Sequence, residues 1–251
     1  MLAAQRRSLL LDRLRRERRV VAKDVATELG ISEDTIRRDL RDLAAAGLCQ
    51  RVYGGALPAS PAVADYPTRR QVGVEGKRRV AAAAAALIRP GATVVVDGGT
   101  TALAVVRALP ATLDATVITH SPTVGAALAE HPRVEVHLIG GRLFKHSVVA
   151  CGAAAVEAAQ AVSADLFLLG VTGVHHDAGL TTGDADEAAM KRALARRAAD
   201  TYVLASAEKI GAASRFSVLP LSAVAGIVTD APADDDTVRR LHDAGVAIVH
   251  A

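Results

Sequence analysis

Residues 32–41 gather hydroxyl and guanidinium side chains at short spacing, namely Ser32, Thr35, Arg37, Arg38 and Arg41. Side chains of these two kinds bind phosphate oxygens and the edges of bases in the grooves of DNA. The alternative is an amphipathic surface helix whose arginines are simply solvated. The choice between the two depends on the elements that hold these residues.

The sequence predicts a helix that begins just after Ser32. Its hydroxyl can accept a backbone N–H bond, and the two acidic residues that follow complement the positive end of the helix dipole. At 100° per residue, Ile36, Leu40 and Leu43 fall within about 60° of one another, with the arginines on the opposite side. Asp39 lies beside the packing face, so we expect it to pair with an arginine and support the fold rather than to read bases.

A shorter helix is predicted to precede this one. Val25, Ala26 and Leu29 have helical spacing, and Gly30 with Ile31 supplies a tight turn. In a helix-turn-helix unit the second helix lies in the major groove while the first braces on the backbone. The segment thus favours DNA binding over a solvated surface helix.

A small β-hairpin, the wing of a winged helix, is predicted after Gly47. Residues 48–52 form a short run, and a glycine turn follows at residues 53–55. Arg51 and the backbone of Gly54 and Gly55 could approach phosphate.

A second group of candidate residues follows a short apolar run at residues 94–96, in the order Asp97, Gly98, Gly99, Thr100 and Thr101. Two glycines let backbone N–H groups approach an anion, the threonines offer hydroxyls, and the start of a helix adds partial positive charge. This chemistry suits phosphate, although the spacing is neither that of a Walker loop nor that of a dinucleotide fingerprint. An ordinary tight turn with a threonine cap is the alternative.

Other predicted strand ends add hydroxyls, glycines and cations. Thr119 and Gly141 each follow a strand, and Lys209 could neutralise a phosphate or face solvent. Glu187 and Lys191 have i,i+4 spacing; they could form a surface salt bridge, worth about 0.2 to 0.5 kcal/mol, or bind polyol hydroxyls.

Helices and buried strands alternate after residue 75, which predicts a mostly parallel sheet covered by helices. In open parallel sheets ligands bind at the carboxyl ends of the strands, where the candidate loops lie. The expected helices are residues 77–88, 101–109, 123–130, 152–162, 185–199 and 235–244. The expected strands are residues 93–96, 116–118, 134–139, 166–169, 201–204, 226–228 and 246–249.

Taken together, these motifs resemble the DeoR family of bacterial transcriptional regulators over nearly the whole chain. Two motifs are similar to the family's N-terminal domain: Ser-x-x-Thr-Ile-Arg-Arg-Asp-Leu, which begins at Ser32, and Tyr-Gly-Gly-Ala at residues 53–56. The loop at residues 97–101 and the later motifs resemble its effector-binding domain. The resemblance implies a winged helix-turn-helix in residues 1–57 and an α/β domain like ribose-5-phosphate isomerase and the CoA transferases in 75–251. Residues 58–74 have prolines at positions 58, 61 and 67 and no sustained period, which predicts a linker or an irregular crossover.

The resemblance also implies the function and the site. It implies a repressor of carbohydrate-metabolism genes that a phosphorylated sugar or polyol releases from double-stranded operator DNA. The residues expected around this effector are Asp97, Gly98, Gly99, Thr100, Thr101, Thr119, Gly141, Glu187 and Lys209. Two positions depart from the family pattern: Ser206 stands where many relatives have Asp, and His120 where Asn is frequent. Glu208 could replace the missing carboxylate only if its loop turns inward.

Charge and composition agree with a DNA-binding N-terminal domain. Residues 1–60 hold 12 Lys/Arg and 8 Asp/Glu, a net charge of +4, whereas the remainder has a net charge of −1. A positive excess favours phosphate contact, although the arginines of the first helix could be only solvated. Aromatic residues are 2% of the chain, which disfavours base stacking as the binding mode.

The remaining expectations concern partners and chemistry. Two cysteines make neither a disulfide framework nor a zinc site, and His175 with His176 is expected to be a polar loop, so no metal and no cofactor are expected. No signal peptide or membrane span is visible, which predicts a cytoplasmic protein. We expect a homo-oligomer, dimer or tetramer, and no catalytic residue. A sugar-phosphate isomerase fused to a DNA-binding domain is the alternative, with Asp97 or Glu187 as its base.

Overall fold

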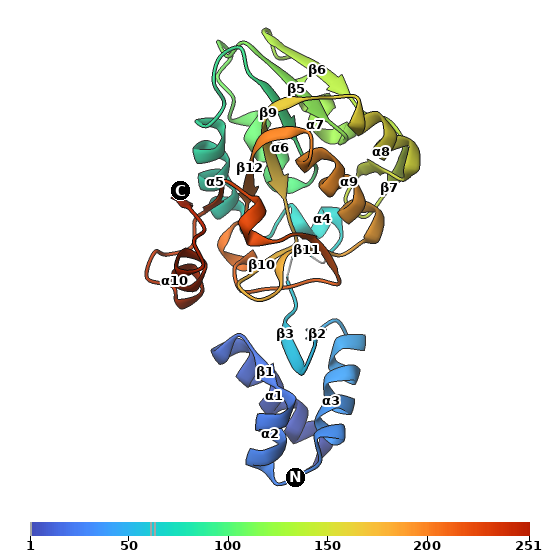
Figure 1. Cartoon of the computed structure of the whole chain (residues 1–251), viewed down its shortest axis with the longest axis vertical. Helices are drawn as coiled ribbons and strands as arrows, with labels where there is room; N and C mark the ends of the chain where they lie inside the picture. The colour runs from blue at the N-terminus through green and yellow to red at the C-terminus, as the bar shows by residue number, and fades with distance from the viewer. Residues whose placement is uncertain (1, 61, 63) are drawn as a thin grey trace.

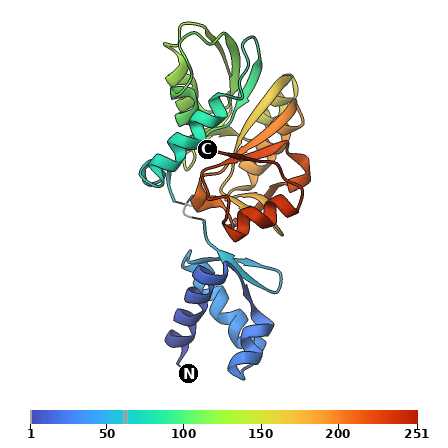
Figure 2. The same ribbon diagram turned by 90° about the vertical axis from the view of Figure 1, so that its left-hand side faces the viewer.

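The computed structural model describes residues 2–60, 62 and 64–251. A small N-terminal unit and a larger α/β unit meet at a narrow connection (Figures 1 and 2). No helix in the described part of the chain is long and apolar enough to cross a membrane.

The N-terminal unit is a helix-turn-helix with a three-stranded sheet of order β1-β3-β2. Its elements are α1 (Ala3–Glu17), β1 (Val20–Val21), α2 (Ala22–Leu29), α3 (Glu33–Ala45), β2 (Cys49–Val52) and β3 (Gly55–Pro58). The predicted helices and hairpin are confirmed. The two-residue strand β1 was not expected, because a strand this short has no periodicity.

One apolar core holds this unit together. Ile36, Leu40 and Leu43 of α3 are buried among residues of α1 and α2. Asp39 is 2% exposed and pairs with Arg6 of α1, and its other oxygen lies 3.4 Å from Nε of Arg7. Asp39 therefore fixes α3 against α1, as its place beside the packing face predicts.

The larger unit is built on a seven-stranded parallel sheet of order β15-β14-β12-β9-β4-β5-β6. Its strands are β4 (Thr93–Val96), β5 (Ala115–Thr119), β6 (Val134–Leu138), β9 (Ala164–Gly170), β12 (Ala198–Leu204), β14 (Gly226–Thr229) and β15 (Ile248–His250). All seven were predicted, with ends that differ by a few residues. Long apolar runs in the central strands follow from burial on both faces.

Helices cover both faces of this sheet. The helices are α5 (Val74–Ala85), α6 (Thr100–Arg107), α7 (Pro122–Leu128), α8 (Ala153–Gln160), α9 (Ala185–Ala195) and α10 (Asp236–Asp243). Residues of α5, α6 and α7 share a core with Val94 and Val96 of β4, whereas residues of α8, α9 and α10 share one with Val95. Alternate residues of a strand thus serve opposite layers.

Two small antiparallel sheets, which the sequence did not predict, lie beside the parallel sheet. One has the order β10-β11-β13 and the other pairs β7 with β8. Their strands are β7 (Arg142–Phe144), β8 (Val149–Cys151), β10 (Gly173–His175), β11 (Gly179–Thr182) and β13 (Phe216–Leu219). Strands of three or four residues give too short an alternation to be read from sequence.

Contacts other than the connecting chain also join the two units. Nη2 of Arg18, at the end of α1, donates to the carbonyl oxygen of Ile210 at 2.6 Å, and Nη1 of Arg19 lies 3.4 Å from Asp177. The predicted linker, residues 58–74, contains a short helix, α4 (Tyr66–Arg69). Residues 61 and 63 of that linker lie outside the described residues, and the boundaries at 57 and 75 stay a prediction.

Candidate functional site

The basic face of α3 begins at a well-formed cap. Oγ of Ser32 accepts from the backbone N–H of Thr35 at 3.3 Å and lies 2.9 Å from the hydroxyl of Thr35. Such a cap satisfies one of the free N–H groups at the start of the helix. Both hydroxyls are therefore held at the end of α3 that enters the groove in a helix-turn-helix complex.

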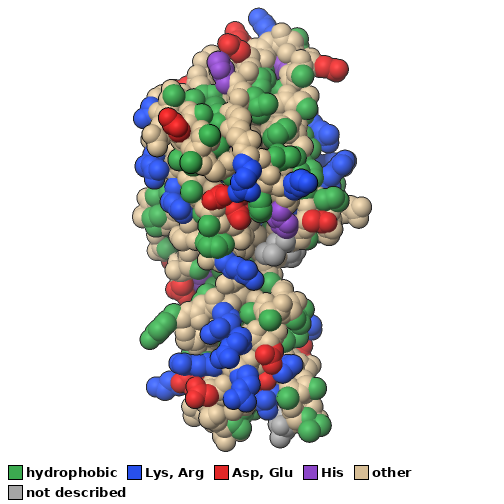
Figure 3. Space-filling view, turned by 90° about the vertical axis from the view of Figure 1, so that its right-hand side faces the viewer, with side chains coloured by type: hydrophobic (Ala, Val, Ile, Leu, Met, Phe, Trp, Pro, Cys, Tyr) green, Lys and Arg blue, Asp and Glu red, His purple; other side chains and the backbone are tan. Residues whose placement is uncertain are grey.

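The arginines of α3 are exposed on the same side. Arg37 pairs with Glu33 one turn earlier, at 2.7 Å, whereas Arg38 and Arg41 have no hydrogen bond or ion pair among the described residues. Figure 3, which views the molecule from the side of α3, shows Lys and Arg side chains gathered on the N-terminal unit. The face is thus free to meet a polyanion.

A groove of about 180 Å³ runs between α3 and the hairpin of β2 and β3; it is lined by Ala22, Arg37, Leu40, Arg51, Val52, Tyr53, Gly54 and Gly55. Tyr53 is fully exposed at the tip of the hairpin and was not among the predicted contacts. A Cβ on Gly55 would lie 1.8 Å from the carbonyl oxygen of Val20. Packing against β1 therefore requires glycine at residue 55, whatever it does toward DNA.

The second candidate site lies where the parallel sheet reverses its strand order. From β4 the chain continues outward through β5 and β6, whereas β9, β12, β14 and β15 extend the sheet on the other side. The carboxyl ends of two such neighbours, here β4 and β9, leave a crevice in which ligands of open α/β sheets bind.

A cavity of about 30 Å³ occupies this crevice. Its walls come from the loops after β4, β9 and β12, from α9, from the loop between β7 and β8, and from the segment between α4 and α5. The residues are Ala62, Arg69, Val72, Lys77, Gly98, Gly99, Thr100, Thr101, Ser147, Gly170, Val171, Thr172, Thr182, Glu187, Lys191, Glu208 and Lys209.

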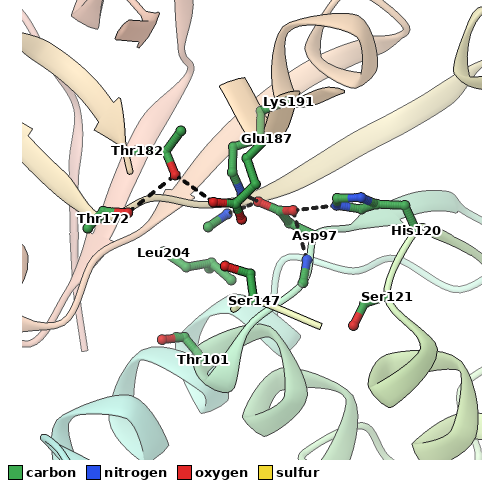
Figure 4. Close-up of polar contacts among 12 residues, drawn as sticks. Asp97, Thr101, His120, Ser121, Ser147, Thr172, Thr182, Glu187, Lys191 and Leu204 are labelled. Atoms are coloured by element: carbon green, nitrogen blue, oxygen red, sulfur yellow. Dashed lines mark hydrogen bonds and ion pairs between the residues drawn. The ribbon is translucent and has the colours of Figure 1, made fainter. Parts of the chain in front are cut away.

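Asp97 lies behind this wall, with no exposed surface, and holds the crevice together (Figure 4). Its Oδ1 accepts from the backbone N–H of Gly98 and from Nε2 of His120, both at 2.7 Å. Its Oδ2 accepts from the N–H of Gly170 at 2.8 Å and from Nζ of Lys191 at 2.5 Å. The carboxylate thus ties the ends of β4 and β9 to α9 and has no acceptor left for a ligand.

The charge of Asp97 is stabilised by its partners. Burial by itself would raise the pKa of its carboxyl group, but the charge of Lys191 and the hydrogen bond from His120 hold that pKa well below its usual range. Nδ1 of His120 also lies 2.8 Å from the carbonyl oxygen of Ala150. Its ring therefore joins β8 to the end of β4.

Four cations line the cavity. Nζ of Lys77 donates to the carbonyl oxygens of Arg69 and Val72, at 2.6 and 2.5 Å, and Nζ of Lys209 lies 3.3 Å from the hydroxyl of Thr101. Burial lowers the pKa of Lys209 to about 8; the charge of Glu208 opposes this shift, and those of Lys77, Arg69 and Lys191 add to it. The wall has more basic than acidic side chains: the basic ones are Arg69, Lys77, Lys191 and Lys209, and the acidic ones are Glu187 and Glu208. An anion would be attracted here.

The carboxylates of the wall are held by hydroxyl groups. Ser206 donates to Glu208 at 2.7 Å, and Thr182 donates to Glu187 at 3.1 Å. A 3-10 turn, η2 (Ala207–Lys209), points both Glu208 and Lys209 at the cavity. The loop after β12 thus turns inward, which was the condition expected for Glu208 to supply a carboxylate in this loop.

The structure brings together six of the nine residues predicted around the effector: Gly98, Gly99, Thr100, Thr101, Glu187 and Lys209. Asp97 lies behind the wall, and neither Thr119 nor Gly141 lines it. Thr119 is fully buried and its hydroxyl accepts from the N–H of Ser121, while Gly141 packs against Ala155.

Sequence reasoning missed several wall residues, above all Arg69, Lys77, Ser147 and Thr172. Arg69 lies within the segment that was read as a linker and Lys77 just after it, while the other two belong to loops next to the small antiparallel sheets. The cationic run of residues 69–79 was a possible signal. Lys191, weighed as half of a surface salt bridge, is 4% exposed and bonds Asp97 instead.

One group of side chains among the described residues has metal-ligand spacing, and it lies at the junction of the two units. Atoms of His175, His176 and Asp177 lie within 4.8 Å of one another. However, Nδ1 of His175 accepts from the backbone N–H of Asp177 at 3.1 Å, and the Asp177 carboxylate pairs with Arg19. The interpretation as a polar loop remains a prediction.

Comparison with known families gives two matches that together span most of the chain. Residues 6–61 match the DeoR-like helix-turn-helix domain, and residues 73–231 match the DeoR C terminal sensor domain.

Curated relatives match over nearly their full length. The chain is 32% identical to the HTH-type transcriptional regulator GlpR of Haloferax volcanii, over 99% of this chain and 98% of the relative. It is 30% identical to the putative aga operon transcriptional repressor of Escherichia coli O157:H7, over 98% and 93%. It is 28% identical to the glycerol-3-phosphate regulon repressor of Escherichia coli K12, over 97% of each.

Likenesses to solved structures are weaker. Ribose 5-phosphate isomerase A of Methanocaldococcus jannaschii matches at a TM-score of 0.39 and 16% identity, over 53% of this chain and 52% of that one. The full-length sorbitol operon regulator SorC of Klebsiella pneumoniae matches at a TM-score of 0.39 and 14% identity, over 82% and 91%.

Proposed function

The chain belongs to the DeoR family of transcriptional regulators, and from this membership we propose that it represses carbohydrate-metabolism genes until a phosphorylated sugar or polyol binds at the β4–β9 crevice. The protein is a DNA-binding regulator and not an enzyme, since its relatives are named as regulators and repressors of transcription. The alternative of a sugar-phosphate isomerase is therefore set aside.

One observation carries the choice of ligand. A cationic cavity lies at the topological switch point, against the Gly-Gly-Thr-Thr start of α6. The first N–H groups of a helix have no partner within it and carry partial positive charge. Lys209 and Lys77 add full charges beside them. A phosphate group fits this chemistry, and the hydroxyl-held carboxylates suit the hydroxyl groups of a sugar.

In this proposal α3 and the wing bind the operator DNA. In this proposal Ser32, Thr35, Arg37, Arg38 and Arg41 meet the major groove, while Arg51 with Gly54 and Gly55 approaches the backbone; Tyr53 joins them at the tip. We further propose a cytoplasmic homo-oligomer that places two or more such helices on repeated or palindromic half-sites.

Measurement of operator affinity with and without ligand tests this function. Fluorescence anisotropy with DNA from upstream of the regulator's own gene, at fixed salt, would be followed across a panel of sugar and polyol phosphates. At least one member is expected to weaken binding to DNA, and by linkage DNA must weaken the binding of that member by the same factor. A panel member that binds the protein and leaves DNA affinity unchanged would contradict the coupling.

A further inference from the structure

A much larger cavity, of about 410 Å³, lies between the two units and adjoins the cavity at the crevice. From the α/β unit it is lined by the antiparallel sheets and their loops, by α4 and by the start of α9, and from the DNA-binding unit by Ala44, Gly47, Cys49 and Gln50. We call it the outer cavity, and the 30 Å³ cavity the inner one. Ala62, Arg69, Ser147, Thr172 and Glu187 line both.

The two volumes set a limit on where a ligand can lie. A volume of about 30 Å³ holds no more than a few water molecules, so the inner cavity is too small for a whole sugar phosphate. Pockets for small molecules usually measure roughly 300 to 1,000 Å³, which includes the outer cavity. A sugar phosphate that places one end in the inner cavity must therefore have most of its atoms in the outer cavity.

The wall of the outer cavity also includes residues whose polar atoms are buried without a partner. Ser214 is 8% exposed, and its Oγ has no hydrogen-bond partner among the described residues. The same is true of Nε of Arg69, whose Nη2 donates to the carbonyl oxygen of His146 at 2.9 Å. Buried polar groups left unpaired are few in native structures, so Ser214 and Arg69 are the side chains of this wall with hydrogen-bonding capacity to spare.

The charges of the two cavities differ in a way that orients the ligand. The inner wall has an excess of cations, whereas the outer wall balances Arg69 and Arg215 with Asp184 and Glu187. A phosphate is attracted to the inner wall. A neutral group with many hydroxyls, which both donate and accept, fits the outer wall.

We propose that the effector binds across both cavities, with its phosphate at the inner wall and its hydroxylated carbon chain between the two units, against Arg69 and Ser214 and beside Gln50 of the wing. This inference rests on the proposed function, since it takes a phosphorylated sugar or polyol as the ligand. It adds that the ligand touches the DNA-binding unit itself. Occupancy then acts on the wing and the end of α3 directly, without a relay through the sheet.

The variant Ser214→Ala gives a sharp test. The hydroxyl that it removes has no partner in the free protein, so the thermal stability without ligand should not fall. Ser217→Ala, the same change at an exposed position of β13, is the matched control. Arg69→Lys keeps the charge and removes Nε, and gives a second variant at the same wall.

Isothermal titration of the full chain would use inorganic phosphate, glycerol 3-phosphate and a set of hexose 6-phosphates. With the hexose phosphate that binds wild type best, Ser214→Ala is expected to weaken affinity roughly 3- to 10-fold, as for the loss of one hydrogen bond, and Arg69→Lys by more. Inorganic phosphate should bind wild type, Ser214→Ala and Ser217→Ala equally.

The outcomes separate this inference from the function on which it rests. Equal affinity of wild type and Ser214→Ala for every sugar phosphate that binds would overturn the bipartite site and leave the sensor function intact. An equal loss for inorganic phosphate and sugar phosphate would also overturn it, since the serine would then act on the inner wall. Failure of wild type to bind any phosphorylated probe would contradict the proposed function itself.

Discussion

Nζ of Lys191 lies 2.5 Å from Oδ2 of Asp97, and the two residues are 94 positions apart in the sequence. Both side chains are buried, and Lys191 comes from α9 while Asp97 directly follows β4. The pair joins a helix to the point where the parallel sheet reverses its strand order. It therefore supports the inner cavity from behind, while Lys191 also forms part of the wall.

Breaking this pair should be costly. Lys191→Met leaves the carboxylate of Asp97 buried without its strongest partner, and we expect the free energy of unfolding to fall by about 3 to 5 kcal/mol. The double variant Asp97→Asn/Lys191→Met removes both charges and should recover part of this loss. Urea unfolding of the two single variants and the double variant measures the coupling. Losses that simply add would mean that the two side chains do not stabilise each other.

Effector binding should weaken as the pH rises above 8. Burial lowers the pKa of Lys209 to about 8, so the free protein loses this charge above that pH, whereas a bound phosphate favours the charged form. Between pH 7.5 and 9.5 a phosphate monoester stays dianionic, because its second pKa is about 6. Titration calorimetry of the tightest sugar phosphate should show affinity falling across this window.

Lys209→Met is the control for that pH dependence. This variant should bind sugar phosphate weakly at every pH of the window, and its operator affinity should no longer respond to the ligand. Its stability should hold or rise at pH 7, because the buried charge of Lys209 is unfavourable in the folded state. An unchanged slope of affinity against pH in Lys209→Met would rule out Lys209 as the titrating group.

Arg38 is an exposed arginine of α3 that makes no hydrogen bond or ion pair with the described residues, so its substitution breaks no contact of those kinds. If it reads a base, Arg38→Ala should cost about 1 to 3 kcal/mol of binding to the operator and relax specificity at one position. Arg15→Ala, at an exposed residue of α1 that is paired with Asp12, is the matched control. Anisotropy titrations on operator and scrambled DNA over a salt series distinguish the cases. An equal loss on both DNAs, with a shallower salt dependence, would make Arg38 a phosphate contact.

Arg18 should couple the two units. It donates to the carbonyl oxygen of Ile210, the residue after Lys209, and its backbone has a φ of 58°, which favours glycine. Arg18→Gly therefore removes the contact and places at this φ the residue that adopts it most easily. Arg18→Ala removes the same contact but keeps a Cβ at this φ. Both variants should lower the factor by which effector reduces operator affinity. A response equal to that of wild type in both would show that the contact carries no coupling.

Much of the fold could be predicted from local patterns. Helix α3 could be predicted from Ser32, the acidic residues after it and the spacing of Ile36 and Leu40. A cap and a helical period are properties of neighbouring residues, so they can be read from the sequence. The seven parallel strands were found because each includes a short run rich in apolar residues, although the edge strands β6 and β15 are only partly buried. Strands such as β7 and β10 were missed because three residues carry no usable period, and pairing with distant segments stabilises them.

For the candidate site, the sequence by itself determined the loops. Gly98, Gly99 and Thr101 follow a buried strand and begin a helix, so an anion site there could be expected from the order of residues alone. What only the tertiary structure decided is which side chains face the ligand. Asp97 points back to Lys191, and Arg69 and Ser214 reach a cavity shared by both units. These positions depend on contacts between segments far apart in the chain, which are fixed by packing and by the pairing of buried charges rather than by local propensity.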